Sequence, residues 1–232
     1  MKTLAAKRLG VHTDTEKSAA LTDNEIKSAI RVATEKNYDG IVIQLPLPVQ
    51  KEDVQSLLDC IPEDKDIDVL TTSGKLHYKD GTSKMIPPVA RAIFEILRTH
   101  NVNLPGKNIV VLGAGRLVGE PVSLMLERMK IPFSTVDINT AEEERNRLLG
   151  VADVIISGIG TPHFVKPNMI KNGVVLIDAG TSEQDGKLLG DIDPMCGEKA
   201  SLFASVPGGV GPVTVVSLFW NLLEQDKINA HD

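Results

Sequence analysis

Three glycines and two prolines crowd residues 206–214, and no other segment has a clearer chemical use. Glycine carries no Cβ and proline fixes φ, so such a backbone can lie closely against a flat ligand. The apolar run at 213–223 predicts a helix, expected to span 213–225, so the loop leads into a helix N-terminus. An ordinary tight turn is the alternative. The candidate binding residues are Pro207, Gly208, Gly209, Val210, Gly211 and Pro212.

A second glycine-rich turn follows the apolar run at 110–112. Glycines at a strand-to-helix turn let backbone N–H groups and the helix dipole hold a pyrophosphate. The spacing is one residue longer than G-x-G-x-x-G, and a merely structural turn is the alternative. The candidate cofactor-binding residues are Gly113, Gly115, Arg116, Leu117, Val118 and Gly119.

Asp137 ends the next expected strand, near the offset at which an acidic side chain meets the adenosine ribose. Its carboxylate would accept hydrogen bonds from the 2′-OH of NAD and repel the 2′-phosphate of NADP. We therefore predict NAD, with NADP less favoured, although Arg116 could offer a cation. The competing interpretation is that Asp137 only caps a helix beginning near Ala141.

Alternating strands and helices predict an α/β fold with parallel strands. Pro87-Pro88 is interpreted as a hinge between two α/β domains: 1–88 with 213–232, and a Rossmann-like domain at 89–212. The first is expected to hold a strand at 40–45 and helices at 22–36 and near 54–61. Helices at 88–100, 117–129 and 142–149 and strands at 108–112, 134–136, 154–157, 174–178 and 201–205 complete the pattern. The last helix is expected to be buried, with Trp220 in the core.

Composition narrows the class of protein. The 232 residues carry a net charge of −6, without a basic run and with 3% aromatic residues, which argues against nucleic acid as a partner. No apolar run approaches a membrane span, and the N-terminus is too polar for a signal peptide. The two cysteines and five histidines show no metal-ligand spacing, so no metal is expected. We expect a cytoplasmic protein that acts on small molecules.

The loop at 206–214 resembles a signature of the methylenetetrahydrofolate dehydrogenase/cyclohydrolase family, and 43–48 (Ile-Gln-Leu-Pro-Leu-Pro) resembles another. The segment 65–68 is similar to the family's lysine–aspartate–x–aspartate run. The resemblance implies a bifunctional enzyme of one-carbon metabolism, usually a homodimer, whose last helix packs against the first domain. It would oxidise 5,10-methylenetetrahydrofolate by hydride transfer to NAD(P) and hydrolyse the methenyl product to 10-formyltetrahydrofolate.

The resemblance also assigns roles to single residues. Lys2 falls on the catalytic lysine, Gln44 would hold it, and Asp68 would bind the pterin ring. Gly158 lies in the expected loop over the dinucleotide, and Gly180 could approach the nicotinamide. The turn at 190–193 is interpreted as structural. The folate would lie between Gln44, Asp68 and the loop at 207–212.

This sequence also departs from the family pattern. The family's tyrosine would fall before Met1, which puts Lys2 on a fraying terminus and makes the cyclohydrolase step the more vulnerable one. Val69 replaces a glycine, so a different backbone or a crowded ring is expected there. Three alternatives remain: a dehydrogenase without cyclohydrolase activity, a truncated non-catalytic paralogue that binds dinucleotide or a partner subunit, and a misassigned start.

Overall fold

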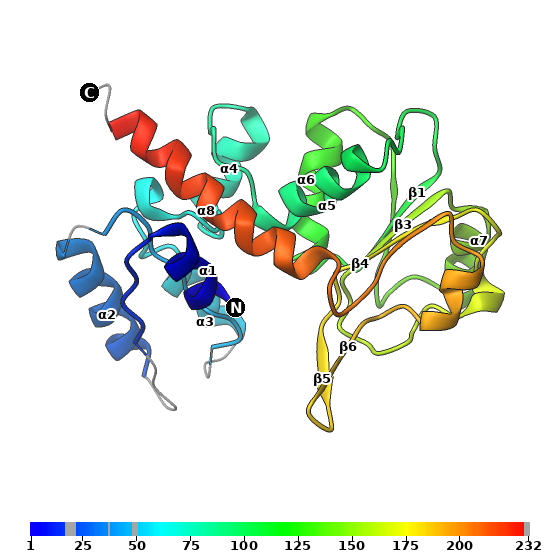
Figure 1. The fold of residues 1–232 in the computed structure, drawn as a ribbon, viewed down its shortest axis with the longest axis horizontal. Helices are drawn as coiled ribbons and strands as arrows, with labels where there is room; N and C mark the ends of the chain where they lie inside the picture. Colours follow the sequence, from blue (N-terminus) through cyan, green and yellow to red (C-terminus); the bar gives the residue numbers. More distant parts are fainter. Residues whose placement is uncertain (17–21, 37, 48–50, 230–232) are drawn as a thin grey trace. The chain divides into compact units, whose positions relative to one another are not determined.

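The computed structural model describes residues 1–16, 22–36, 38–47 and 51–229 (Figure 1). The chain divides into two compact units. The first contains the residues up to Pro88 and those from Val215 onward, and the second runs from Val89 to Thr214. Helix α8 (Val210–Asn229) therefore contributes residues to both units.

A parallel five-stranded sheet forms the centre of the second unit, in the order β2-β1-β3-β4-β7. Strands β1, β3 and β4 are buried along their whole length, because a parallel sheet is covered on both faces. All five strands were predicted to within one residue at each end. They are β1 (Ile109–Leu112), β2 (Ser134–Val136), β3 (Val154–Ser157), β4 (Val175–Asp178) and β7 (Leu202–Ala204).

Helices cover both faces of this sheet, as Figure 1 shows. On one face, α5 (Pro88–Thr99) and α6 (Gly119–Arg128) pack on alternate strand residues such as Val111 and Ile156. On the other face, α7 (Glu142–Val151) packs on the intervening residues, among them Leu112 and Ile155. The short helices η2 (Pro167–Met169) and η3 (Pro194–Glu198) add side chains to that second core. This arrangement confirms the predicted Rossmann-like architecture.

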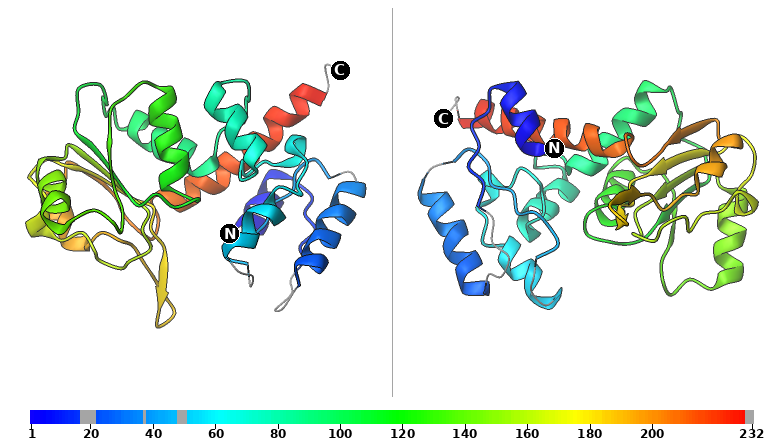
Figure 2. Two further views of the ribbon diagram at one scale, coloured as in Figure 1. Left: turned by 180° about the vertical axis from the view of Figure 1, so that it is seen from behind. Right: turned by 60° about the horizontal axis from the view of Figure 1, so that its bottom comes forward.

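A two-stranded antiparallel hairpin, β5 (Ser182–Gln184) with β6 (Lys187–Leu189), was not predicted. It projects away from the parallel sheet (Figure 2, yellow). Asp185 and Gly186 form its turn with φ values of 52° and 72°. An Asp-Gly pair is the sequence signal for such a two-residue turn, since both positions need positive φ.

The helices of the first unit are short. Besides part of α8, the unit contains α1 (Lys2–Leu9), α2 (Asp23–Glu35), α3 (Lys51–Leu58), η1 (Glu63–Lys65) and α4 (Thr72–Asp80). A capping box between Thr22 and Glu25 starts α2 where the sequence predicted it. Ile26, Ile30 and Leu57 form a small core between α2 and α3.

The strand predicted at 40–45 is wrong. Residues 40–45 have no strand conformation, and the N–H of Ile41 donates to Lys65 O in η1 at 2.8 Å. A strand needs a neighbouring strand to satisfy its backbone, and none of the described residues supplies a ladder here. The apolar side chains of Ile41 and Ile43 still face the core with α2 and α3.

Helix α8 is less buried than its sequence predicted. Val215, Phe219 and Leu222 pack against Ala5 and Ala6 of α1, which agrees with the expectation that the last helix packs against the first unit. In contrast, Trp220 is 51% exposed, and Val216 and Leu223 are also exposed. Trp220 is therefore not a core residue, because it lies with Val216 and Leu223 on one exposed stripe of this helix. Within the described residues, no helix has both the length and the hydropathy that crossing a bilayer requires.

Candidate functional site

The glycine-rich turn lies where the strand order reverses. The chain runs from β1 through α6 to β2 on one side and then places β3 on the other side of β1. Open α/β sheets bind ligands at such a switch point, beyond the carboxyl ends of the strands. The loops that follow β1 and β3, at 113–118 and 158–161, meet at this edge.

Close packing accounts for the glycines of this turn. A Cβ on Gly119 would lie 1.9 Å from Gly113 O, and Gly113 has a φ of 93°. Gly115 is exposed, as is Ala114, and Arg116 is partly buried. The turn therefore presents bare backbone directly before α6, which suits a pyrophosphate. The helix begins at Gly119, two residues later than predicted, so Leu117 and Val118 belong to the loop.

The loop after β3 is packed against the turn after β1. A Cβ on Gly158 would lie 2.4 Å from Val118 Cβ, and a Cβ on Gly113 would lie 3.0 Å from Gly158 O. At Gly180 the missing Cβ leaves room for a carboxylate, because it would lie 2.0 Å from Asp191 Cγ. The close approach at Gly180 is therefore made by another part of this chain.

Asp137 directly follows β2, the strand next to β1. Its Oδ1 accepts hydrogen bonds from Asn139 N at 2.9 Å and Thr140 Oγ1 at 3.2 Å. The Asn139 N–H is the main reason why the pKa of Asp137 lies below its ordinary value, so the side chain is ionised at neutral pH. It closes its own turn and does not cap α7, whose N-cap is Ala141.

Only the first part of the 207–212 segment is a loop, because α8 begins at Val210 and not at residue 213 as predicted. Gly211 and Pro212 lie in its first turn, where proline is tolerated because its missing N–H would have no partner there. Gly208 has a φ of 105°, and a Cβ on Gly209 would lie 2.6 Å from Ser205 O. The Val206–Pro207 peptide bond is cis.

In the first unit, three predicted site residues come together. Lys2 Nζ donates to Gln44 Oε1 at 3.2 Å and lies 4.0 Å from Asp68 Oδ2. The Lys2 side chain is 38% exposed and that of Asp68 is 21% exposed. Lys2 is the first residue of α1, whose Ala6 packs against α8. Gln44 lies in the segment 43–48, of which Pro48 is outside the described residues.

Burial is the main cause that raises the pKa of Asp68. The ammonium of Lys2 opposes this effect and lowers the pKa, whereas the charge of Asp66 adds to it. Asp66, two residues away and fully buried, therefore disfavours the ionised form of Asp68, whereas Lys2 favours it. A carboxylate held in this way can accept two N–H bonds from a 2-amino-4-oxopyrimidine ring.

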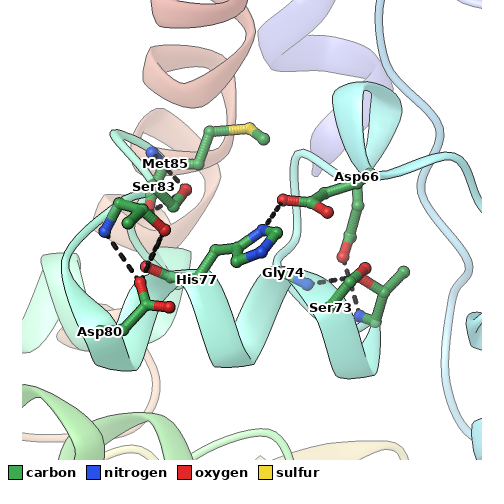
Figure 3. Close-up of polar contacts among 10 residues, drawn as sticks. Asp66, Ser73, Gly74, His77, Asp80, Ser83 and Met85 are labelled. Atoms are coloured by element: carbon green, nitrogen blue, oxygen red, sulfur yellow. Dashed lines mark hydrogen bonds and ion pairs between the residues drawn. The ribbon is translucent and has the colours of Figure 1, made fainter.

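A network around Asp66 shapes the loop that carries Asp68. Asp66 accepts N–H bonds from Leu70 at 3.2 Å and Thr71 at 2.8 Å. Thr71 in turn caps α4 by accepting the N–H of Gly74 at 3.0 Å, and Figure 3 shows Asp66 and Gly74 at this end of the helix. Farther along α4, His77 contacts Glu63 of η1. This hydrogen bond is the first cause that raises the pKa of His77.

Val69 keeps a backbone that glycine adopts easily, with a φ of 55°. The expected difference in backbone from the family, or a crowded ring, stays a prediction. The valine side chain is buried, and its Cγ1 lies beside Gly74. Burial of the side chain offsets part of the strain that a β-branched residue has at positive φ.

Asn221 was not predicted as part of this region. This fully buried residue of α8 donates from Nδ2 to Ile67 O at 2.9 Å and Ile86 O at 2.8 Å, and it accepts the N–H of Ile86. It therefore holds the backbone next to Asp68. The available signal was a polar residue inside the apolar run at 213–223. Among the described residues, no group of three or more His, Cys, Asp or Glu side chains could hold a metal ion.

Comparison with known proteins gives consistent matches. Residues 87–230 match the family described as "Tetrahydrofolate dehydrogenase/cyclohydrolase, NAD(P)-binding domain". A "Bifunctional protein FolD" of Mycoplasmopsis synoviae is 40% identical over 199 residues, which cover 82% of this chain and 69% of that protein.

Two solved structures share the whole fold. One is the methylenetetrahydrofolate dehydrogenase-cyclohydrolase of Trypanosoma brucei, complexed with NADP and an inhibitor. It has a TM-score of 0.91 and 30% sequence identity, and the match covers 100% of this chain and 82% of that chain. The 5,10-methylenetetrahydrofolate dehydrogenase of Bombyx mori also has a TM-score of 0.91, at 29% identity, with 100% and 83% covered.

Proposed function

Because the chain belongs to the tetrahydrofolate dehydrogenase/cyclohydrolase family, we propose that it oxidises 5,10-methylenetetrahydrofolate and hydrolyses the 5,10-methenyl product to 10-formyltetrahydrofolate. One observation carries this proposal: Lys2 Nζ lies within 4.0 Å of both Gln44 Oε1 and Asp68 Oδ2. These residues come from three separate segments, and each matches a family motif.

The dehydrogenase step needs mainly positioning from the protein. The nicotinamide of NAD(P), when bound, accepts the hydride from the methylene carbon. Asp68 would orient the pterin by accepting its N–H bonds. The bare backbone of 113–119 and the loops containing Gly158 and Gly180 would orient the dinucleotide, and the segment 207–212 would bind the folate. Effective positioning of two reactants can supply a large share of the rate enhancement.

The cyclohydrolase step needs a group that handles protons. Water attacks the methenyl carbon, a C–O bond forms, and the amine of Lys2 would take the proton that the water loses. The bond between this carbon and N5 then breaks, Lys2 would return its proton to N5, and the remaining hydroxyl proton leaves to solvent, which gives the 10-formyl product. Gln44 Oε1 accepts a hydrogen bond from Lys2 Nζ and so aims the amine. General acid–base help of this kind contributes typically ~10²–10⁴-fold to a rate.

We further propose that NAD is the preferred dinucleotide. Asp137 follows β2 and is ionised, and Ala114 in the glycine-rich turn offers no cation to a 2′-phosphate. The Trypanosoma brucei relative, in contrast, is complexed with NADP. Ionised Asp137 would disfavour NADP by repelling its 2′-phosphate, a difference on the order of tenfold or more.

The direct test is absorbance of the products with 5,10-methylenetetrahydrofolate, run in parallel with NAD and NADP. We expect NADH formation, and we expect Asp137→Ser to lower the NAD/NADP preference by roughly tenfold without changing the KM for folate. The matched control is Glu143→Ser, which removes a carboxylate from the exposed first turn of α7. A wild-type preference for NADP would refute the cofactor proposal and leave the reaction standing. No turnover, in a folded protein that binds dinucleotide, would refute the reaction.

A dehydrogenase without hydrolysis is the second candidate. It is favoured by the partial exposure of Lys2, the side chain on which the hydrolytic step depends. Methenyl product that accumulates at the rate of NADH formation, with no 10-formyl product beyond the uncatalysed rate, would identify this candidate. We also propose that the protein works in the cytoplasm as a homodimer. Size-exclusion chromatography with light scattering tests the dimer.

A further inference from the structure

Two buried carboxylates lie at the carboxyl edge of the second unit's sheet. Asp178 is 1% exposed and Asp191 is 0% exposed. Within the described residues, their hydrogen-bond partners are backbone N–H groups and one hydroxyl, and no ion pair to either carboxylate is found. Buried charges are costly, so such groups persist where several donors converge on them.

Asp191 holds the loop that follows β3. Its Oδ2 accepts from Ser157 Oγ and Ile159 N, both at 2.8 Å, and its Oδ1 accepts from Thr161 N at 2.9 Å. Both oxygens are therefore committed to one five-residue segment, 157–161. This segment also contains Gly158, which packs against Val118 of the glycine-rich turn.

Asp178 holds the backbone of Asp191 in turn. It accepts the N–H groups of Gly180 and Asp191 at 3.1 Å and that of Ile192 at 2.9 Å. The two carboxylates leave no room for side chains beside them. A Cβ on Gly180 would lie 2.0 Å from Asp191 Cγ, and a Cβ on Gly190 would lie 2.1 Å from Asp178 Oδ2. Three loops of this edge, at 157–161, 178–180 and 190–192, thus form one hydrogen-bonded unit.

We propose that Asp191 is a positioning residue for hydride transfer, because it fixes the 157–161 loop against the 113–119 turn and so orients the dinucleotide. This inference rests on the proposed dehydrogenase function. Asp191 touches neither substrate, and its effect reaches the cofactor through Ile159, Thr161 and Gly158. The turn at 190–193 is therefore more than a structural connection between strands.

The test is Asp191→Asn, which keeps size but turns one acceptor oxygen into an N–H₂ group. That group must face at least one of the donors on the 157–161 loop. The dinucleotide Kd, measured by calorimetry without turnover, is expected to rise roughly tenfold. The kcat is expected to fall several-fold and the KM for folate to change less than about twofold, since folate does not contact this loop in the proposed arrangement.

The matched control is Asp193→Asn, the same chemical change two residues away. Asp193 accepts Met195 N at 3.0 Å and pairs with Lys166, and neither bond involves the 157–161 loop. We expect this variant to bind dinucleotide like the wild type. Equal losses of dinucleotide affinity in both variants, or wild-type affinity in Asp191→Asn, would overturn the inference.

Ser157→Ala provides a second variant if Asp191→Asn does not fold. It removes one of the three donors to Asp191 and is expected to raise the dinucleotide Kd by roughly two- to fivefold, with the folate KM unchanged. An unchanged Kd would overturn the inference. A wild-type protein that binds dinucleotide but has no dehydrogenase activity would instead refute the proposed function, so the two failures are distinguishable.

Discussion

The carboxylates of the two units are held in opposite ways. In the second unit, the oxygens of Asp178 and Asp191 accept six hydrogen bonds from neutral donors and are fully buried. In the first unit, Asp68 is 21% exposed, and its one ion pair among the described residues is a 4.0 Å contact with the partly exposed Lys2.

This difference distinguishes a carboxylate that shapes a site from one that can serve as part of it. Asp191 has both oxygens committed to the chain, so it cannot bind a ligand without breaking its own loop. Asp68 is held mainly by charge and can exchange its contact for a substrate. The degree of hydrogen-bond satisfaction is therefore the physical property that assigns their roles.

The largest effect is expected at Lys2. Lys2→Met should lower cyclohydrolase kcat about 10²–10⁴-fold, because the proton acceptor is lost, while dehydrogenase kcat falls less than ~10-fold. Lys7→Met, in the same helix and exposed, serves as the control and should leave both activities unchanged. Separate assays of methylenetetrahydrofolate oxidation and of methenyltetrahydrofolate hydrolysis measure the two rates. Equal losses in both would mean that Lys2 only supports the fold of the first unit.

Asp178 should make a pH-dependent contribution to stability. Burial is the first cause that raises its pKa from 3.8 to about 6, so the folded protein binds this proton more tightly than the unfolded chain. The stabilising contribution of Asp178 is then complete below pH 4 and falls as the pH rises to about 6, by up to roughly 3 kcal/mol.

Denaturant unfolding of wild type and Asp178→Asn between pH 4.5 and 7.5 measures this contribution. The difference in unfolding free energy, wild type minus variant, should decrease as the pH rises through this window. A difference that increases with pH would show that the folded state favours the ionised form, which contradicts the dominance of burial at this site.

Lys2 should also set the pH dependence of folate binding through Asp68. Because the ammonium lowers the pKa of Asp68, Lys2→Met should raise that pKa. The dehydrogenase kcat/KM for folate, which needs ionised Asp68 in the proposed mechanism, should then decline at a higher pH on the acid side than in wild type. Lys7→Met should keep the wild-type profile. If the acid side of the profile is the same in Lys2→Met and wild type, then Lys2 does not influence the ionisation of Asp68.

The smallest effect is expected at Val69. Val69→Gly removes positive-φ strain of about 1–2 kcal/mol but also a buried side chain of similar worth, so stability should change by less than ~1 kcal/mol. Chemical denaturation measures this difference. A destabilisation above 2 kcal/mol would show that packing against Gly74 dominates. Val54→Gly, in α3 without positive φ, is the control and should destabilise by more.

The sequence predicted the parallel sheet well because local and global signals agree there. Continuous apolar runs such as β3 and β4 have the length of a strand buried on both faces, and glycine or aspartate ends them. The same reasoning failed at 40–45, where an equally apolar run has no partner strand among the described residues. It also failed at Trp220, because periodicity cannot say how many sides of an apolar helix are covered.

The sequence by itself determined which residues could do chemistry: the glycine-rich turn, Asp137, and the motif residues Lys2, Gln44 and Asp68. The turn and Asp137 follow from residue type and spacing along the chain, whereas Lys2, Gln44 and Asp68 follow from the resemblance of their segments to family motifs. Only the tertiary structure decided that Lys2 reaches Gln44 and Asp68, and that Asp191 anchors a loop more than thirty residues before it. The physical reason is that hydrogen-bond satisfaction and burial depend on groups distant in sequence, which no local pattern encodes.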